Sequence, residues 1–276
     1  MSSTWAVCKR EFKAYFLTPI GYVVVGMVAL IAGMSFAISF ITHAAITQDP
    51  SAYSYTAVPD FEETFLSPYL VFCGTLIMFL TPLITMRLLA EERHRGTIEF
   101  LLTQPLRDRE IIFGKYLAAL GMLGTMLLVV VVNLCIMGYF VAVEPAVLVF
   151  GLLTVFLMGA ACISLGLFVS AVTKTQIMSG TMTFGVTLIL FIVGNLGEDM
   201  PTANPAPGSW PEALRSLVGF FYDIVRGLIV ELPIDAHARE MALGIVQPVD
   251  IMYYVLFSAF FIFLTFRALE SRNWRG

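Results

Sequence analysis

The chain has 276 residues, of which 58% are apolar and only 13% are charged, and its mean hydropathy is +0.85. Soluble domains carry charge on about a quarter of their residues, so this composition excludes an ordinary soluble protein and indicates an integral membrane protein. The formal net charge of −4 says little about partners, because acidic and basic residues are segregated along the sequence.

Residues 4–18 precede the first long apolar run and have the pattern of an amphipathic helix. Its apolar positions on one helical face are Trp5, Cys8, Phe12 and Phe16. Basic side chains occupy the opposite side and the margins, a pattern that predicts a helix lying in the membrane interface. An early start of the first span is the alternative. The Thr18-Pro19 pair favours a break, because the residue before proline avoids the helical region.

Six apolar segments are long enough to cross a membrane. A spanning helix needs about 20 apolar residues and pairs its backbone polar groups internally. The predicted spans are 20–42, 68–86, 116–141, 147–172, 178–197 and 251–266. The first run is far longer than the roughly 7–15 residues of a signal-peptide core, so we interpret it as a retained helix. The fold class is an all-α integral membrane protein, with one transmembrane domain over residues 1–276.

The distribution of positive charge predicts the orientation, because cytoplasmic segments carry excess Lys and Arg. In a six-span topology, 13 of the 16 Lys and Arg residues fall on one side. The loop over 43–67 on the other side has acidic residues and no Lys or Arg. Both termini are therefore expected in the cytoplasm.

The segment 87–115 is a charged connection between the second and third spans. The second span is predicted to continue past Arg87 to Arg95, where Gly96 ends it. A short helix capped by Thr97 follows and stops at Pro105, and a new helix with acidic residues in its first turn leads into the third span. The pattern predicts a cytoplasmic helical hairpin with a short cross-helix at its tip.

Two interpretations of this hairpin remain on physical grounds. A positive anchor at the lipid headgroups requires only Lys and Arg. Here five acidic residues alternate with the arginines, and Ile98, Phe100 and Leu101 lie among them. Mixed charge around an apolar centre is typical of a docking surface for another protein.

The segment 198–250 connects the fifth and sixth spans on the outer side. Its start is rich in proline, after which Ser209 and Glu212 form a predicted capping box with Pro211 in the first turn. Apolar residues follow at helical spacing as far as Leu228, and a second short helix is predicted over 235–243 with Gly244 as its stop. Four positions remain open for the amphipathic helix: on the membrane surface, re-entrant, over the substrate path, or packed across the span ends.

Several types of chemistry are absent from the sequence. There is no Gly-x-x-x-x-Gly-Lys-Ser/Thr loop, so the chain is not expected to hydrolyse ATP alone or to be an enzyme. His43, His94 and His237 have no partners at metal-ligand spacing, so neither a metal nor another cofactor is expected in this chain. The spans contain neutral polar groups instead of ionisable ones, which disfavours ion-coupled transport.

The neutral polar residues of the spans are interpreted as structural. Ser164 and Ser170 lie among small residues and predict close helix packing. Asn133 is expected to form a hydrogen bond to a neighbouring helix, with a position lining a path as the alternative. None of the four cysteines falls in an outer loop, so no disulfide is predicted.

The stretch EERHRGTIEFLLTQPLRDREIIFGKYLA, residues 91–118, resembles the pattern of ABC-2 type (type V exporter-like) permeases. The six spans and the amphipathic N-terminal helix agree with that family. The segments FFYDIVRGLI and DIMYYVLFSAFFIFLTFRALESRNW are most similar to permeases of the gliding-motility type. Two features depart from the pattern. Arg107 stands where many relatives have a capping Ser, so Asp108 is expected to cap the helix, and an insert around 232–247 lengthens the outer loop.

The resemblance implies a permease subunit in the cell inner membrane that works with a separate cytoplasmic ATPase. The ATPase subunit is expected to be a homodimer and to bind ATP and Mg. A second permease chain, identical or paralogous, would complete the path, and no nucleic acid is involved. The implied ATPase-coupling surface comprises Glu91, Glu92, Gly96, Thr97, Glu99, Leu101, Leu102 and Pro105. The alternative function is a non-transporting membrane scaffold that anchors a cytoplasmic partner.

Overall fold

The computed structural model describes residues 3–57, 60–94, 96, 107–141, 143–198, 200–203, 205–207, 210–245 and 247–273. All regular structure within these ranges is helical, and six helices are long and apolar enough to cross a membrane. The predicted all-α class and the number of spans are therefore confirmed.

The six long helices each contain most of one predicted span. They are α2 (Pro19–Gln48), α3 (Ser67–Thr85), α6 (Asp108–Phe140), α7 (Pro145–Val172), α8 (Gln176–Glu198) and α11 (Pro248–Asn273). Several of them extend well beyond the apolar run. A helix that has formed gains one hydrogen bond for each added residue, so it does not stop where the apolar residues stop.

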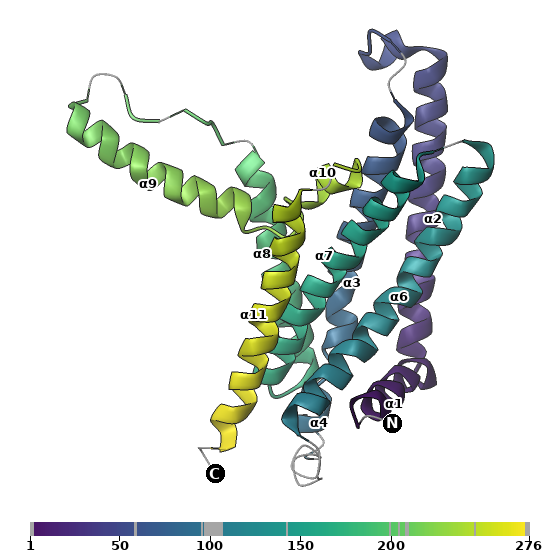
Figure 1. Ribbon diagram of the computed structural model, residues 1–276, viewed down its shortest axis with the longest axis vertical. Helices are drawn as coiled ribbons and strands as arrows, with labels where there is room; N and C mark the ends of the chain where they lie inside the picture. The colour runs from purple at the N-terminus through teal and green to yellow at the C-terminus, as the bar shows by residue number, and fades with distance from the viewer. Residues whose placement is uncertain are drawn as a thin grey trace.

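Shorter elements connect or flank the spans. They are α1 (Ser3–Leu17), a 3-10 turn (Pro50–Tyr53), a π-helical turn (Glu62–Leu66), α4 (Ala90–His94), α9 (Glu212–Glu231) and α10 (Ala238–Ala242). Figure 1 shows the spans side by side, with α1 and α4 at one end and α9 projecting from the bundle near the other.

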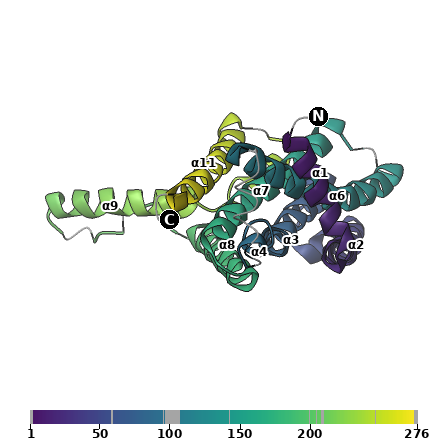
Figure 2. The same cartoon turned by 90° about the horizontal axis from the view of Figure 1, so that it is seen from below.

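The helices α3 and α7 form the centre of the bundle. In their most apolar stretches, 61% and 56% of the residues are buried, against 17% in α2, 22% in α8 and 17% in α11. The view along the bundle in Figure 2 shows α2 and α11 on opposite sides of α3 and α7. Much of the apolar surface of α2, α8 and α11 therefore remains free for lipid or another protein chain.

Glycines on α7 allow its neighbours to approach closely. A Cβ atom at Gly166 would collide with Thr85 of α3, and one at Gly159 would lie 2.6 Å from the Leu123 side chain of α6. Small residues at helix contacts are the usual means of close packing in membranes. Asn133 adds a polar contact, since its side-chain amide donates to the Tyr69 hydroxyl oxygen at 2.8 Å. Its predicted hydrogen bond to a neighbouring helix is confirmed.

The prediction of an uninterrupted helix from the second span to Arg95 is wrong. The α-helix ends at Thr85, residues 86–89 form turns, and α4 begins at Ala90. Pro82 lies inside α3 and has no N–H to donate. The Thr85 hydroxyl bonds to the Thr81 carbonyl at 3.1 Å, a type of bond that bends helices. The hairpin therefore has a joint at its base.

The N-terminal helix α1 is separate from the first span, as the Thr18-Pro19 pair predicted. Thr18 is extended, with ψ 150°, and α2 begins at Pro19. One face of α1 packs on α6, where a Cβ at Gly121 would lie 3.0 Å from the Phe12 side chain. Trp5 is 55% exposed. Part of the predicted apolar face thus contacts protein, and the interfacial position of the rest stays a prediction.

The outer segment contains the two predicted helices with shifted ends. Pro211 is the residue before the first turn of α9 and not part of that turn, and Ser209 lies outside the described residues. The second helix is shorter than predicted, but Gly244 does lie just beyond its end with φ +81°. Left-handed backbone of this kind favours glycine at helix ends.

Candidate coupling site at the charged end

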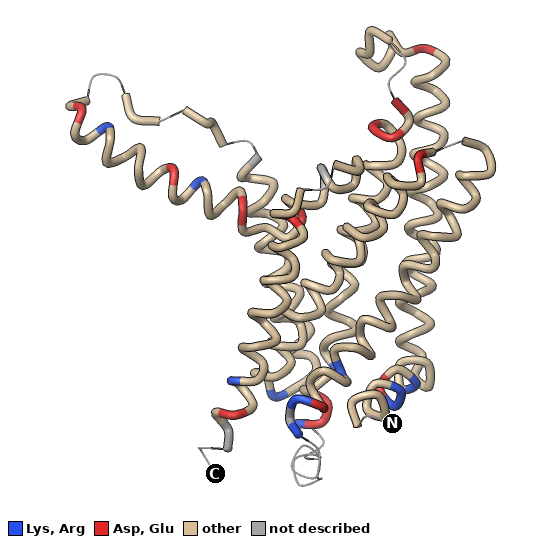
Figure 3. The backbone as a smooth tube through the Cα atoms, viewed as in Figure 1, with Lys and Arg blue, Asp and Glu red and all other residues tan. Residues whose placement is uncertain are grey.

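The end of the bundle where α1, α4 and the first turns of α6 meet is called here the charged end. Figure 3 shows that Lys and Arg residues gather at this end of the spans, whereas the opposite ends of α2, α3 and α7 carry acidic residues. The short helix α4 lies at the centre of the charged end. It carries Glu91, Glu92 and Arg93, each of which connects it to another part of the chain.

Lys115 is the centre of an ion network between three helices. Its side chain is 1% exposed, and its Nζ lies 2.8 Å from Glu92 Oε1 of α4 and 3.2 Å from Glu11 Oε1 of α1. Arg10 extends the network, since its Nη2 lies 2.7 Å from Glu11 Oε1 and 3.7 Å from Glu92 Oε1. The pairs join α1, α4 and α6 at one point.

Burial makes this network sensitive to the loss of any one member. A buried charge is tolerated when it is paired, and removing its partner leaves an uncompensated charge away from water. Burial raises the pKa of the Glu11 carboxyl, but the charges and hydrogen bonds of Lys115 and Arg10 outweigh that effect and lower the net pKa below its usual value. Glu11 is therefore held in its charged form.

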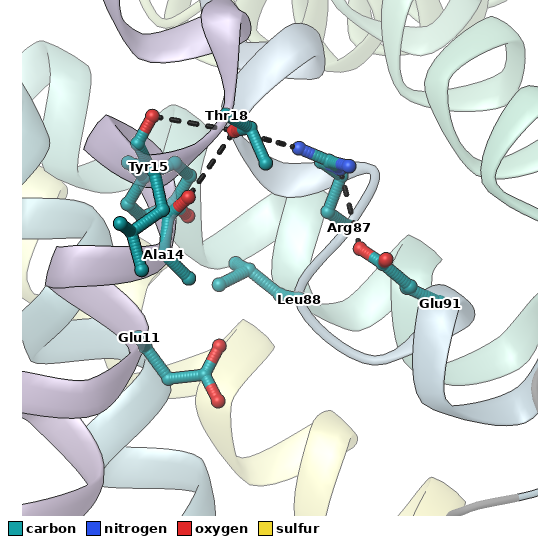
Figure 4. Close-up of a pocket in the computed structure, with 8 residues that line it drawn as sticks. Glu11, Ala14, Tyr15, Thr18, Arg87, Leu88 and Glu91 are labelled. Atoms are coloured by element: carbon teal, nitrogen blue, oxygen red, sulfur yellow. Dashed lines mark hydrogen bonds and ion pairs between the residues drawn. The ribbon is translucent and has the colours of Figure 1, made fainter.

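A second set of contacts links α4 to the joint between α1 and α2. Arg87 Nε lies 3.2 Å from Glu91 Oε2, and Arg87 Nη1 donates to Thr18 Oγ1 at 3.1 Å. The Tyr15 hydroxyl donates to the Ile84 carbonyl at 3.2 Å. Figure 4 shows these side chains around a cavity of about 270 Å³, with Glu11 and Glu91 pointing into it from opposite sides. The middle and the C-terminal end of α1 are thus fixed near the hairpin base.

Helix α7 holds α4 through backbone groups. The Ser170 hydroxyl oxygen accepts hydrogen bonds from the Leu89 and Ala90 N–H groups, each at 3.0 Å. The first N–H groups of a helix have no partner within it, so Ser170 caps α4 from a distant part of the sequence. Arg93 Nη1 donates to the Val172 and Thr173 carbonyls at 2.8 Å, and so binds the C-terminal end of α7.

Only part of the predicted coupling surface lies among the residues that the structure describes. Glu91 and Glu92 lie on α4, and Gly96 has the predicted left-handed conformation, with φ +67°. Outside the described residues lie Thr97, Glu99, Leu101, Leu102 and Pro105. The prediction that Asp108 caps the following helix is wrong. Arg107 is the capping residue, and its backbone N–H donates to the Glu110 side chain at 3.1 Å.

Sequence reasoning missed five residues of this site. Lys115 had been noted only as part of the motif and of the positive charge, and Ser170 only as a small residue for helix packing. The additional contacts come from Arg10, Glu11 and Arg93. Apart from the pair of neighbours Arg10 and Glu11, the partners lie on other helices and far along the sequence, so no local spacing could have indicated them.

At the opposite end, the loop that leads from α9 to α10 is bonded to α11. His237 Nδ1 lies 2.9 Å from Asp250 Oδ1, and the Tyr254 hydroxyl donates to the Ile234 carbonyl at 2.8 Å. These contacts attach the loop between α9 and α10 to α11. Within the described ranges, no group of three or more His, Cys, Asp or Glu residues is arranged to hold a metal.

The fold and the charged end define a multi-pass membrane protein whose hairpin base is tied to three other helices. The sequence matches the family model of the ABC-2 family transporter proteins over residues 5–256. The chain therefore belongs to this transporter family, whose members are membrane components that generally work with a separate ATP-binding-cassette ATPase. Among curated proteins, none matches the sequence significantly.

Proposed function

We propose that the chain is the permease subunit of an ATP-binding-cassette exporter, and that the hairpin 87–115 transmits the motion of a cytoplasmic ATPase subunit to the spans. The observation that supports this role is the network around Lys115, which connects α4 to α1 and α6. An element that receives force has to be fixed to what it moves. On the side of α7, Arg93 of α4 donates to carbonyls at the end of α7, and Ser170 of α7 accepts from N–H groups at the start of α4, which meets the same requirement.

The proposed orientation has the charged end and both termini in the cytoplasm of a cell with an inner membrane. The gathering of Lys and Arg at that end supports it. The ATPase pair binds ATP and Mg, and this chain supplies no nucleotide site. The proposed surface that binds the ATPase comprises Glu91, Glu92, Gly96, Thr97, Glu99, Leu101, Leu102 and Pro105.

A second permease chain, identical or paralogous, completes the translocation path. The little-buried apolar surfaces of α2, α8 and α11 leave room for such a partner and for lipid.

Membership of the gliding-motility subgroup is proposed from the sequence resemblance near the C-terminus. The family match does not separate subgroups. The neutral spans suit apolar or bulky cargo, or mechanical work without cargo. The scaffold alternative is not favoured by a match to a transporter family.

The helix α9 is proposed to lie on the outer surface of the membrane. Its apolar side chains are exposed, including Leu214 at 51%, Leu217 at 53% and Phe221 at 62%. On the other face Gly219 is buried, and the neighbouring Tyr222 hydroxyl donates to the Pro201 carbonyl at 2.6 Å. The preceding loop therefore contacts part of the polar face, and Figure 1 shows that loop on the side of α9 away from the charged end. The apolar face is left for lipid.

The coupling role is tested with the double variant Glu99→Lys/Leu101→Lys. The permease and its ATPase subunit are expressed together, purified as a complex and reconstituted. We expect the variant to insert into the membrane normally but to lose co-purification with the ATPase and ATP-driven transport. Lys174→Glu, an exposed change in the loop between α7 and α8, is the matched control. Transport by the double variant at the level of the control would refute the coupling surface.

A further inference from the structure

Helices α6 and α11 both rest on α7 and leave an apolar groove between them. The groove has a volume of about 540 Å³. Its walls include Phe113 and Tyr116 of α6, Ala160 of α7, and Ser258 and Ala259 of α11. The Tyr116 hydroxyl donates to the Ala160 carbonyl at 3.2 Å, so it is turned to the backbone. The groove therefore presents mainly hydrocarbon and aromatic surface.

A second cavity, of about 600 Å³, adjoins this groove at the charged end. The two share Phe113, Phe263 and Phe266, so they lie end to end along the helices, and together they are called here the channel. The Phe113 and Phe266 rings are in contact where the two parts adjoin, with 5.7 Å between their centroids. The lining of the second cavity also includes three arginines and one carboxylate, namely Arg107, Arg109, Arg267 and Glu270. The apolar groove thus adjoins a cationic cavity, which is called here the cationic mouth.

The charges of the mouth are only partly compensated by the protein. Arg267 pairs with Glu270 at 3.0 Å and lies over the Phe263 ring, with 5.3 Å from its guanidinium carbon to the ring centroid. Among the described residues, neither Arg107 nor Arg109 is paired with a carboxylate. Both are exposed where α6 begins, and the N-terminus of a helix adds further positive potential. The mouth therefore has net positive charge to offer to an anion.

We propose that this channel binds one anionic phospholipid, with its phosphate at Arg107 and Arg109 and an acyl chain in the groove between α6 and α11. Guanidinium groups match phosphate oxygens in a bidentate manner, and basic pockets between spans favour anionic headgroups. A free phosphate would use the mouth alone, whereas a lipid uses both parts. In the orientation proposed above, the lipid belongs to the cytoplasmic leaflet.

Such a lipid would connect the hairpin to a helix that the ion network does not reach. Arg107 and Arg109 lie at the end of the hairpin, and Arg267 lies near the end of α11. Direct packing between α6 and α11 is slight in comparison with the packing of each on α7. The bound lipid would therefore hold the start of α6 against α11.

The test measures lipid binding to the full-length permease by native mass spectrometry. The probes are phosphatidylglycerol and phosphatidylcholine with identical acyl chains, and glycerol phosphate as a competitor without chains. We expect one phosphatidylglycerol per chain, bound about thirtyfold more tightly than phosphatidylcholine, which corresponds to about 2 kcal/mol for the two arginines together. Glycerol phosphate is expected to compete poorly.

Two variants separate the headgroup from the chain. Arg107→Gln/Arg109→Gln should reduce phosphatidylglycerol binding to the level of phosphatidylcholine, while Lys9→Gln/Lys13→Gln, which removes equal charge from exposed positions of α1, should not. Ala259→Trp fills the groove and should weaken both lipids. Leu256→Trp, on a part of α11 that does not line the groove, should weaken neither.

Four outcomes would overturn the proposal. One is equal affinity for the two lipids, and another is an equal loss in the α1 control. The third is full binding by Ala259→Trp with strong competition by glycerol phosphate, which would show an anion site without a lipid. A change in oligomeric state caused by Ala259→Trp, with lipid binding intact, would instead identify the groove as a contact between copies. None of these results depends on the ATPase subunit.

Discussion

The two ends of the molecule are held together in different ways. At the charged end, a buried lysine, two glutamates and a serine on a distant helix fix α4 to its neighbours. Near the other end, α9 packs mainly on α8 and exposes its apolar face. The difference agrees with the proposal that force enters the protein at the charged end. A rigid base suits an element that transmits motion, whereas α9, in its proposed position, would be free to follow the membrane surface.

The largest expected effect is that of Lys115→Met. The change leaves Glu11 and Glu92, whose side chains are only 19% and 16% exposed, without their lysine. Removing one partner of a buried ion pair costs about 3–5 kcal/mol, so the thermal unfolding midpoint in detergent micelles should fall strongly. Adding Glu92→Gln should recover part of the loss, because one buried carboxylate is then neutral. A midpoint equal to that of the exposed control Lys174→Met would show that the network does not stabilise the charged end.

A smaller loss is expected for Ser170→Ala. This change leaves the Leu89 and Ala90 N–H groups without their acceptor, and unsatisfied buried donors cost about 1–3 kcal/mol each. Ser164 is the matched control, since it is equally buried on α7 but bonds only to the Ala161 carbonyl of its own helix. Ser164→Ala should therefore cost clearly less in chemical denaturation. Equal losses for the two serines would contradict the capping of α4 by α7.

The pH dependence of stability should reveal the contribution of the ionised Glu11 carboxylate. Its folded-state pKa lies below the ordinary value of 4.5, because Lys115 and Arg10 outweigh the effect of burial. The stabilisation is therefore fully present above pH 4.5 and is lost as the pH falls below that value toward the folded-state pKa. As the pH is lowered across this range, the thermal unfolding midpoint should fall less steeply in Glu11→Gln than in the unchanged protein. Identical slopes would argue against the ionised pair.

The smallest effect on the stability of the bundle is expected at α9. Leu217→Ser/Phe221→Ser changes two exposed side chains, so the free energy of unfolding should shift by less than about 0.5 kcal/mol. The same variant should show greater water accessibility of a spin label at Leu214 in lipid vesicles, because the altered face of α9 binds the membrane surface less strongly. A large loss of stability would mean that α9 packs against protein, and the contrast between the two ends would disappear.

The parts of the fold that could be predicted follow from strong local constraints. Each span needs a long apolar run because its backbone groups must be paired within it, and α9 showed its apolar residues at helical spacing. The joint at residues 86–89 was missed because Pro82 and the threonines near it permit a continuous helix as well as a bent one. The contacts of Lys115 and Ser170 were missed because their partners are brought close only by tertiary packing.

The central claim is that α1, α4 and α6 move as one body when the ATPase binds nucleotide. Spin labels at the exposed positions Lys9 and Leu117 measure the distance between α1 and α6 within one chain, in a background with exposed Cys135 replaced by serine. In the complex with its ATPase, we expect this distance to be the same with and without a non-hydrolysable ATP analogue. The distance between the Lys9 labels of two paired chains should change. A Lys9–Leu117 distance that changes as much as the distance between chains would contradict a rigid coupling site.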